Sequence, residues 1–359
     1  MSSATTSAPL LQVQDLRVHF ATEDGVVKAV DGISYDLERG QVLGIVGESG
    51  SGKSVSSLTI MGLSRAQNAR ISGSAIFDGR DMLTLDAEQL RSVRGNEIAM
   101  IFQDPLSSLH PFYRVGAQLV EAIQAHRDVP KGEATDRALE LLALVGIPDP
   151  KSRLAAYPHE FSGGMRQRAM IAMALANEPQ LLIADEPTTA LDVTVQAQIL
   201  ELIGRLKDQL GMAVIIITHD LGIVAETADN IAVMYGGRIV ERGSTQRIFA
   251  APEHPYTWGL LGSIPRLDSP PGTDLVPIAG RPPSLINLPD GCAFHPRCPY
   301  VLPRHRKVTP ELVAVADGSG HAVACLLAHE TRVRVWRELR SGALPEDARE
   351  VVVTEAPDG

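Results

Sequence analysis

Residues 47–54 read GESGSGKS and follow the short apolar run QVLGIV at residues 41–46. This stretch fits the pattern G-x-x-x-x-G-K-[ST] directly after a strand, which is the context that the pattern requires. Backbone N–H groups of such a turn form a concave anion site, and the dipole of the next helix adds to it. A chance match of a Gly/Ser-rich loop is the alternative. We predict a phosphate-binding loop, whose residues are Gly47, Ser49, Gly50, Ser51, Gly52, Lys53 (reaching the outer phosphates) and Ser54 (coordinating Mg²⁺).

A second apolar run ends in two acidic residues. Residues 181–186 read LLIADE, and residues 213–218 read AVIIIT. Continuous apolar strands of this kind suit a sheet that is buried on both faces. After the first strand, Asp185 is placed to hold Mg²⁺ and Glu186 to polarise a water for attack on a γ-phosphate. The alternative is a strand that simply ends in charge.

Other segments complete an α/β pattern around these runs. Strand patterns cover residues 11–20, 32–37 and 41–46, and helical patterns cover residues 115–146 and 164–177. We therefore expect an α/β core that carries a helical insertion near residues 105–178. No internal repeat of 20 to 50 residues is found.

Length and composition limit the classes of function. At roughly 150 residues per domain, 359 residues suggest two or three units. Lys and Arg total 33 against 43 Asp and Glu, and this net charge of -10 argues against a general nucleic-acid binder. No apolar run reaches about 18 residues, so no membrane span is expected. Residues 1–9 lack the basic start and apolar middle of a secretory signal.

The composition changes after residue 250. Residues 251–310 hold 13 of the 24 prolines, so we expect a turn-rich path without long helices. All 3 cysteines lie between Cys292 and Cys325, and the odd number favours a reducing, cytoplasmic location over a disulfide framework. A helical pattern covers residues 331–340, and the acidic end at residues 355–359 is expected to be frayed.

The phosphate loop is part of an ordered set of motifs that resembles the set in ATP-binding cassette (ABC) ATPases. FSGGM at residues 161–165 resembles the family's LSGGQ signature, with Met165 in place of the usual Gln. The phosphate-facing Ser and Gly are kept, so Met165 is not expected to inactivate the site. The resemblance implies an ABC-type nucleotide-binding domain, a P-loop core sheet with a helical subdomain. The matching residues are Gln103 (Q-loop), Ser162, Gly163 and Gly164 (signature), Asp185 and Glu186 (Walker B pair), Asp192 in Ala190-Leu191-Asp192 (D-loop) and His219 (switch).

The resemblance also implies roles for these residues. Glu186, His219 and Gln103 are expected to act in catalysis, and Ser54, Gln103 and Asp185 to hold Mg²⁺. In the family, the signature turn contacts the ATP that is held by the partner domain, so that two chains sandwich each nucleotide. A Ser-Gly-Gly turn that opens a helix is itself a phosphate site. A buried structural histidine is the alternative for His219.

An aromatic residue that stacks on adenine is expected upstream of the phosphate loop. Phe20 is the nearest one, and it is equally compatible with a strand residue of the core.

Three motifs after residue 250 narrow the family. HPYTWGLLGSIP at 254–265, IAGRPPSL from 278 and PDGCAFHPRCP at 289–299 look like the C-terminal extension of oligopeptide/dipeptide-type importer ATPases. The resemblance therefore covers residues 10–329. We expect an ATPase domain at 10–250, a small Pro/Cys-rich extension at 251–329, and a helix with an acidic tail at 330–359.

Such ATPases often hold an iron–sulfur cluster through four cysteines of the extension. Here Cys292, Cys298 and Cys325 are the expected ligands, and His305 stands where the family pattern has the remaining cysteine. The set suits a [4Fe–4S] cluster or a structural Zn²⁺, and a site that has lost its metal is the third option. The nearby alternatives for the fourth ligand are His295, His321 and His329.

The resemblance implies the ATP-hydrolysing subunit of a peptide-class ABC importer. Its expected partners are a second ABC ATPase subunit, with a heterodimer favoured, two separate permease subunits and an extracytoplasmic solute-binding protein. The chain would then act at the cytoplasmic face of the membrane. Two alternatives stay open. One is a non-transport ABC ATPase that acts on nucleic acid or the ribosome. The single cassette and the acidic net charge argue against this alternative, so no nucleic-acid partner is expected. The other is a metal-sensing regulatory ATPase.

Overall fold

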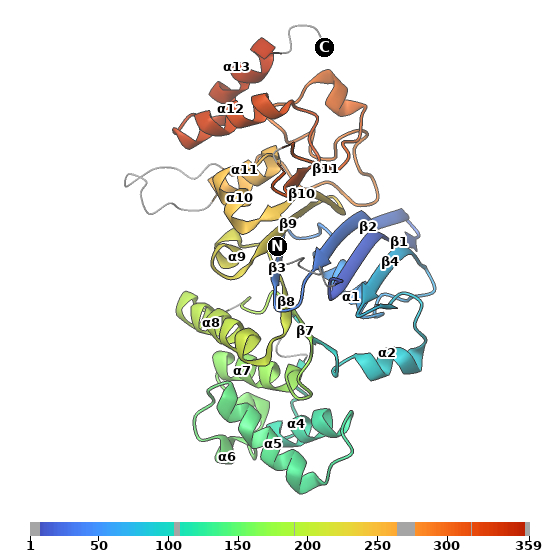
Figure 1. The fold of residues 1–359 in the computed structure, drawn as a ribbon, viewed down its shortest axis with the longest axis vertical. Helices are drawn as coiled ribbons and strands as arrows, with labels where there is room; N and C mark the ends of the chain where they lie inside the picture. The colour runs from blue at the N-terminus through green and yellow to red at the C-terminus, as the bar shows by residue number, and fades with distance from the viewer. Residues whose placement is uncertain (1–7, 104–107, 190, 264–276, 317, 356–359) are drawn as a thin grey trace, which may run out of the picture.

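The computed structural model describes residues 8–103, 108–189, 191–263, 277–316 and 318–355, which form two sheets flanked by helices (Figure 1). The larger sheet has eight strands in the order β11-β12-β10-β9-β3-β8-β7-β6. The run from β9 to β6 is parallel, and β10, β12 and β11 continue the sheet antiparallel. The strands are β3 (Val42–Val46), β6 (Ile98–Ile101), β7 (Leu181–Asp185), β8 (Ala213–Thr218), β9 (Asn230–Tyr235), β10 (Arg238–Ser244), β11 (Val313–Ala314) and β12 (Ala322–Val323).

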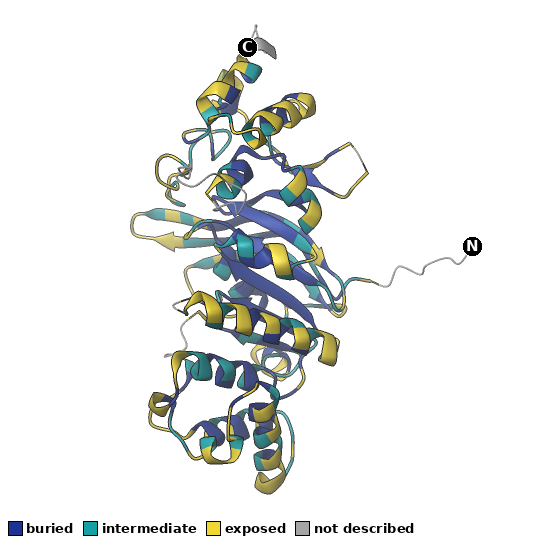
Figure 2. Cartoon of the chain, turned by 90° about the vertical axis from the view of Figure 1, so that its left-hand side faces the viewer, coloured by how far each residue is buried: buried dark blue, intermediate teal, exposed yellow. Residues whose placement is uncertain are grey.

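The three apolar runs form the centre of this sheet, as predicted. Every residue of β3, β7 and β8 is buried, and these strands lie inside the molecule in Figure 2. Side chains of β7 alternate between the two faces: Leu182 and Ala184 pack into one core cluster, and Leu181 and Ile183 into the other. A strand that is buried on both faces needs no polar positions.

A smaller antiparallel sheet covers one side of this core. Its order is β2-β1-β4-β5, and its buried side chains join the cluster that contains Leu43 and Ile45 of β3. The two strands predicted here are confirmed and are longer than expected. The bounds are β1 (Leu11–Thr22), β2 (Gly25–Leu37), β4 (Ala69–Phe77) and β5 (Arg80–Asp81).

Helices gather beyond the β7 side of the large sheet, at the lower end of Figure 1. The helical pattern predicted at residues 115–146 is two helices, because the chain turns before Pro130, the N-cap of α5. The start of the predicted insertion, residues 105–107, lies outside the described residues. The helices up to residue 227 are α1 (Lys53–Ile60), α2 (Ala87–Val93), α4 (Val115–Gln124), α5 (Lys131–Leu144), α6 (Pro150–Arg153), η1 (Pro158–Glu160), α7 (Gly163–Ala174), α8 (Val193–Leu210) and α9 (Leu221–Thr227).

The C-terminal part lies at the other end of the molecule (Figure 1). In the described part of residues 251–310 the helices are α11 and the 3-10 turn η2, in agreement with the proline content. The helix predicted at residues 331–340 is confirmed as α12, but the region expected to be only an acidic tail holds a further helix, α13. Ala348 and Val352 of α13 are buried with Val335 of α12. The helices are α10 (Thr245–Ala250), α11 (Pro255–Gly262), η2 (Pro303–Arg306), α12 (His329–Arg340) and α13 (Pro345–Glu355).

The sheet runs without a break into the C-terminal part. β12 pairs with β10 through Glu241 opposite Val323 and Arg242 opposite Ala322. Residues 1–7 and 356–359, which include parts of the predicted N-terminal stretch and frayed end, lie outside the description. Within the described residues, no helix has both the length and the apolar character that crossing a membrane requires.

Candidate functional site

The predicted phosphate loop connects β3 to α1, and glycine is required at both of its ends. Gly47 and Gly52 have φ angles of 155° and 99°. A Cβ atom at Gly47 would lie 2.2 Å from the Met234 carbonyl oxygen, and one at Gly52 would lie 2.1 Å from that of Ala29. The loop backbone is therefore pressed against β9 and β2, which no larger residue would allow.

Lys53 is the first residue of α1, and its ammonium group lies over the loop. Its Nζ donates to the carbonyl oxygens of Gly47 at 2.7 Å and Glu48 at 2.9 Å. Burial lowers the pKa of Lys53, whereas the carboxylates of Glu186 and Asp185 act in the opposite direction. The charge of Lys53 is thus held next to the two predicted acidic residues.

Ser54 and Asp185 meet between α1 and the end of β7. The Ser54 hydroxyl donates to Oδ1 of Asp185 at 3.0 Å. Burial raises the pKa of Asp185, and the bond from Ser54 opposes that rise. A hydroxyl and a carboxylate oxygen side by side are hard ligands that suit Mg²⁺.

Glu186 follows β7 and is held by three side chains. Gln103 Nε2 and Thr189 Oγ1 each donate to Oε2 at 2.8 Å, and His219 Nδ1 lies 3.2 Å from Oε1. The φ angle of Glu186 is 46°, a left-handed backbone that is costly for a residue other than glycine. Burial raises the pKa of Glu186, but the bonds from Thr189 and His219 outweigh it, so the net pKa lies below the ordinary value.

The structure therefore brings together Lys53, Ser54, Asp185, Glu186, Gln103 and His219, which the sequence analysis selected from four separate segments. Thr189 was not selected. The only signal for it was a hydroxyl residue three positions after the acidic pair.

The signature and D-loop residues lie at two exposed helix starts. Ser162 is the N-cap of α7 and accepts from the Met165 N–H at 3.3 Å, and Asp192 is the N-cap of α8. The two starts are neighbours, because a Cβ atom at Gly163 would lie 3.6 Å from Leu191 Cδ2. Ala190 of the predicted D-loop lies outside the described residues.

Phe20 lies in β1, opposite Val27 of β2, and is half-buried against the core. Its stacking on adenine stays a prediction.

The three predicted cysteine ligands of the extension are neighbours, because Cys292 and Cys298 pack against one apolar cluster and Cys298 and Cys325 against the next, but they form no metal-binding group within the described residues. Cys292, Cys298 and Cys325 are free thiols, and among the described residues no three His, Cys, Asp or Glu side chains are placed to hold a metal ion. The His305 Nδ1 accepts the Leu302 N–H at 2.8 Å, and its buried Nε2 has no partner. A neutral imidazole in this state carries its proton on Nε2 and has no free lone pair for a metal. The predicted four-ligand centre thus does not fit this arrangement.

The other candidate histidines have partners of their own. His295 Nδ1 lies 3.0 Å from the Cys292 carbonyl oxygen, His321 Nε2 lies 2.8 Å from Glu241, and His329 Nδ1 lies 3.0 Å from Glu253.

The three thiols lie in apolar surroundings, and burial raises their pKa values, that of Cys325 to about 11. Burial also lowers the pKa of His305 to about 4.

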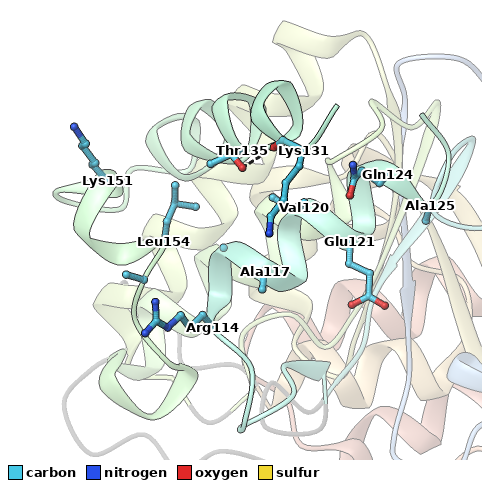
Figure 3. A pocket seen from close by; sticks show the side chains of 12 residues that line it. Arg114, Ala117, Val120, Glu121, Gln124, Ala125, Lys131, Thr135, Lys151 and Leu154 are labelled. Carbon is cyan, nitrogen blue, oxygen red and sulfur yellow. Dashed lines mark hydrogen bonds between the residues drawn. The ribbon is translucent and has the colours of Figure 1, made fainter. Parts of the chain in front are cut away.

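A separate hollow of about 840 Å³ lies in the helical part, between α4, α5 and the chain around Leu154 (Figure 3). Its wall is partly apolar and carries the charged side chains of Arg114, Glu121 and Lys131. None of the predicted site residues lines it, so the hollow is not part of the site described above.

Comparison with known proteins gives a consistent set of relatives. The family described as ABC transporter matches residues 30–189, and the family described as oligopeptide/dipeptide transporter, C-terminal region, matches residues 240–304. The oligopeptide transport ATP-binding protein OppD of Salmonella typhimurium is 52% identical over 307 residues, 84% of this chain and 91% of that protein. The dipeptide transport ATP-binding protein DppD of Bacillus subtilis is 51% identical over 319 residues, 89% of this chain and 94% of that protein.

Solved structures agree. A dimeric ATP-binding cassette in a post-hydrolysis state, bound to ADP and Pi, is 25% identical with a TM-score of 0.59, over 66% of this chain and 98% of that one. The cbiO1 protein of Clostridium perfringens, part of an ABC transporter complex, is 30% identical with a TM-score of 0.57, over 68% of this chain and 92% of that one.

Proposed function

The chain belongs to the family of ATP-binding subunits of oligopeptide and dipeptide ABC transporters, and from this premise we propose that it hydrolyses ATP to power the import of peptides through separate membrane subunits. The observation that carries the proposal is the arrangement around Glu186. Its carboxylate is held by Gln103, Thr189 and His219, next to the Ser54–Asp185 pair.

The loop at residues 47–54 binds the phosphates of ATP. Lys53 leaves the carbonyl oxygens of Gly47 and Glu48 and turns to the outer phosphates. Ser54, Asp185 and the amide oxygen of Gln103 would hold Mg²⁺, which neutralises charge on the phosphates. The Ser54–Asp185 contact at 3.0 Å supports this ligand pair.

Glu186 acts as the general base for the attacking water. Its lowered pKa keeps the carboxylate ionised at neutral pH, which is the form that accepts a proton. His219 and Gln103 orient the carboxylate from two sides, since each lies at one of its oxygens.

Ser162, Gly163, Gly164 and Asp192 act on the nucleotide of a second ATPase subunit. The exposure of Ser162, Gly163 and Asp192 at the starts of α7 and α8 supports this role, because a helix start presents free N–H groups to an anion. The solved cassette relative is itself dimeric. ATP that bridges two surfaces favours the closed pair. We propose that the partner is a related ATPase, so that the pair is a heterodimer.

Two permease subunits dock near the segment after Gln103 and hold the chain at the cytoplasmic face of the membrane, while a solute-binding protein delivers the peptide outside. Residues 104–107 lie outside the described residues, but large exposed aromatic residues flank them. Phe102 is 42% exposed, Phe112 82% and Tyr113 59%. Exposed aromatic residues of this kind are typical of protein interfaces. The relatives are transport proteins, which supports this role over one on nucleic acid or the ribosome.

Lys53→Ala tests the proposal in the transporter reconstituted in vesicles with its permeases and binding protein. We expect the variant to lose binding of a fluorescent ATP analogue and ATP-driven uptake of a labelled peptide. Lys151→Ala, far from the phosphate loop in sequence and exposed, is the matched control and should behave as wild type. Unchanged uptake by the Lys53 variant would refute the proposed role.

For the extension, we propose that Cys292, Cys298 and Cys325 are half-buried free thiols, because His305 offers no lone pair to a metal. Protein purified without oxygen should then be colourless and lack stoichiometric iron, sulfide and zinc. A brown preparation with iron and sulfide, or one zinc per chain, would restore the metal prediction. His305→Cys supplies a fourth thiol, so colour that appears only in this variant would show that the natural chain lacks a ligand at position 305.

A further inference from the structure

Glu48, the second residue of the phosphate loop, is held by two side chains of the C-terminal extension. The Tyr256 hydroxyl in α11 accepts the Glu48 N–H at 2.8 Å. Arg297 binds the Glu48 carboxylate with both arms, NH1 to Oε2 at 2.6 Å and NH2 to Oε1 at 3.0 Å. These contacts join positions 208 and 249 residues apart in the sequence.

Arg297 is fixed in this orientation. Its side chain is 3% exposed, and its Nε donates to the Ala279 carbonyl oxygen at 2.9 Å. The guanidinium group lies over the rings of Tyr235 and Phe294, at 5.8 and 6.0 Å from their centroids. A planar guanidinium that is packed against aromatic rings and anchored through its Nε is suited to a bidentate carboxylate contact, which a lysine could not reproduce.

Tyr256 is held equally firmly. Its side chain is fully buried, and its ring packs against Tyr235 and Phe294 with centroids 4.7 and 5.4 Å apart. Tyr256 and Arg297 therefore share one aromatic cluster and reach Glu48 from the same side of the protein. Their contacts restrain both the backbone and the side chain of this loop residue.

Glu48 links the extension to the residue that meets the phosphates. Its carbonyl oxygen accepts from Lys53 Nζ at 2.9 Å. Its carboxylate belongs to a loop that binds ATP, and an unpaired negative charge there would repel the phosphates. Arg297 supplies the opposite charge from a site that is shielded from water, where screening is weak.

We propose that Arg297 and Tyr256 are positioning residues of the ATP site, which hold the phosphate loop through Glu48 while Arg297 cancels the charge of the Glu48 carboxylate. The C-terminal extension then sets the affinity of the chain for ATP without touching the nucleotide. This inference rests on the proposed role of residues 47–54 in phosphate binding.

Four variants of the full-length chain test the charge argument: Arg297→Ala, Arg297→Lys, Glu48→Gln and the double variant. The readouts are the Kd for a fluorescent ATP analogue and the KM and kcat of the assembled transporter. Arg297→Ala should raise the Kd and KM by roughly tenfold, with kcat changed by less than about threefold, because ground-state binding is what is lost. Arg297→Lys should fall between Arg297→Ala and wild type, because it keeps the charge but not the two-armed contact.

The double variant carries the decisive result. Glu48→Gln removes the repelling charge, so Glu48→Gln with Arg297→Ala should bind ATP within about threefold of Glu48→Gln alone, which corresponds to less than about 0.7 kcal/mol. A purely structural role for Arg297 would not be rescued in this way. If the double variant binds as weakly as Arg297→Ala, the charge argument is wrong.

Arg332→Ala is the matched control. Arg332 forms a buried ion pair with Glu253, Nε to Oε2 at 2.6 Å, which ties α12 to the extension but does not reach the loop. This variant should lower the Tm and leave the Kd for ATP unchanged. An equal rise of Kd in Arg332→Ala and Arg297→Ala would show that both act through loss of stability, and the proposal would fall.

Two further measurements keep the outcomes distinct. Tyr256→Phe removes one hydroxyl and should still fold. It should raise the Kd for ATP by about threefold, the scale of one hydrogen bond. This variant carries the test if the Arg297 variants do not fold, and a wild-type Kd would then overturn the proposal. Lys53→Ala reports on the site itself. If it loses ATP while Arg297→Ala binds normally, only the inference fails. If Lys53→Ala binds normally, the loop assignment fails and the inference with it.

Discussion

Two of the glutamate–histidine pairs in this protein lie in opposite surroundings. The Glu186 and His219 side chains are 14% and 62% exposed, with Oε1 and Nδ1 3.2 Å apart. The Glu241 and His321 side chains are 0% and 1% exposed, with Oε1 and Nε2 2.8 Å apart. The same pair of groups is thus open to solvent in one region and sealed in the other.

The partners of each glutamate show what this difference means. Glu241 in β10 also accepts the N–H groups of Glu253 and His254, at 2.5 and 3.1 Å, so it joins the sheet to the start of α11. Glu186 is held by the side chains of Gln103, Thr189 and His219, which lie in loops after strands of the large sheet. Burial therefore makes the Glu241–His321 pair a structural joint between the sheet and α11. Exposure of His219 leaves the Glu186–His219 pair available for chemistry.

Glu241→Ala is expected to have the largest effect. It leaves the N–H groups of Glu253 and His254 and the ring of His321 buried without an acceptor, and each orphaned group costs about 1–3 kcal/mol. We expect the free energy of unfolding in urea to fall by at least about 3 kcal/mol. Glu241→Gln keeps one acceptor oxygen and should cost less. A loss below about 1 kcal/mol for the alanine variant would contradict a structural joint.

Glu186→Gln should act on chemistry and hardly on stability. Removing a positioned general base should lower ATP turnover at this site by at least ~100-fold, about 2.7 kcal/mol on the barrier, while ATP still binds. The second site of a heterodimer must be silenced first, because its activity would mask the result. Near-normal single-turnover hydrolysis would remove Glu186 from the role of base.

The dependence of stability on pH tests the sealed region in another way. Burial, together with the charge of Arg332, lowers the pKa of His254 to about 3. Between pH 6.5 and 3 the unfolded chain binds a proton there and the folded chain does not, so stability is lost as the pH falls through this window. His254→Asn can still accept the Tyr256 N–H and should lose up to about 2 kcal/mol less than wild type between pH 7 and pH 5. Identical losses in the two proteins would show that His254 is not held neutral.

Gly163→Asp adds charge at an exposed helix start, outside both glutamate–histidine pairs. A Cβ atom there makes ordinary contact with Leu191 at 3.6 Å, so the variant should fold. The new carboxylate would meet the phosphates of the partner's nucleotide, and we expect ATP-dependent closure of the pair to weaken by about tenfold or more. The check is the ATP dependence of dimerisation by light scattering. Closure with wild-type affinity would show that this turn does not meet the partner's nucleotide.

The meeting of the side chains around Glu186 could be predicted from the sequence, because strand ends fix their positions. The apolar runs at β3, β7 and β8 are parallel neighbours, and their carboxyl ends lie at one edge of the sheet. Asp185 is the last residue of β7, His219 directly follows β8, and Ser54 lies in the first turn of the helix after β3. Their meeting could therefore be predicted without knowing the loops.

The C-terminal extension has no comparable set of parallel strand ends to fix the positions of its side chains. The family pattern suggested a common metal for Cys298 and His305, but the turn η2 brings the His305 ring to the Leu302 N–H instead. No short motif links Arg297 or Tyr256 to Glu48, because only the folded path of the chain after β10 brings them together. The helix α13 was missed since its buried face depends on α12 being present.

The pairing of β12 with β10 has a consequence for anyone who shortens this protein. A chain cut after residue 250 would keep β10 but lose β12, which covers it. The outer side of β10 would then be an uncapped edge with free N–H and C=O groups, ready to pair with the same edge of another molecule. Such a truncated cassette should self-associate through this edge more readily than the full-length chain.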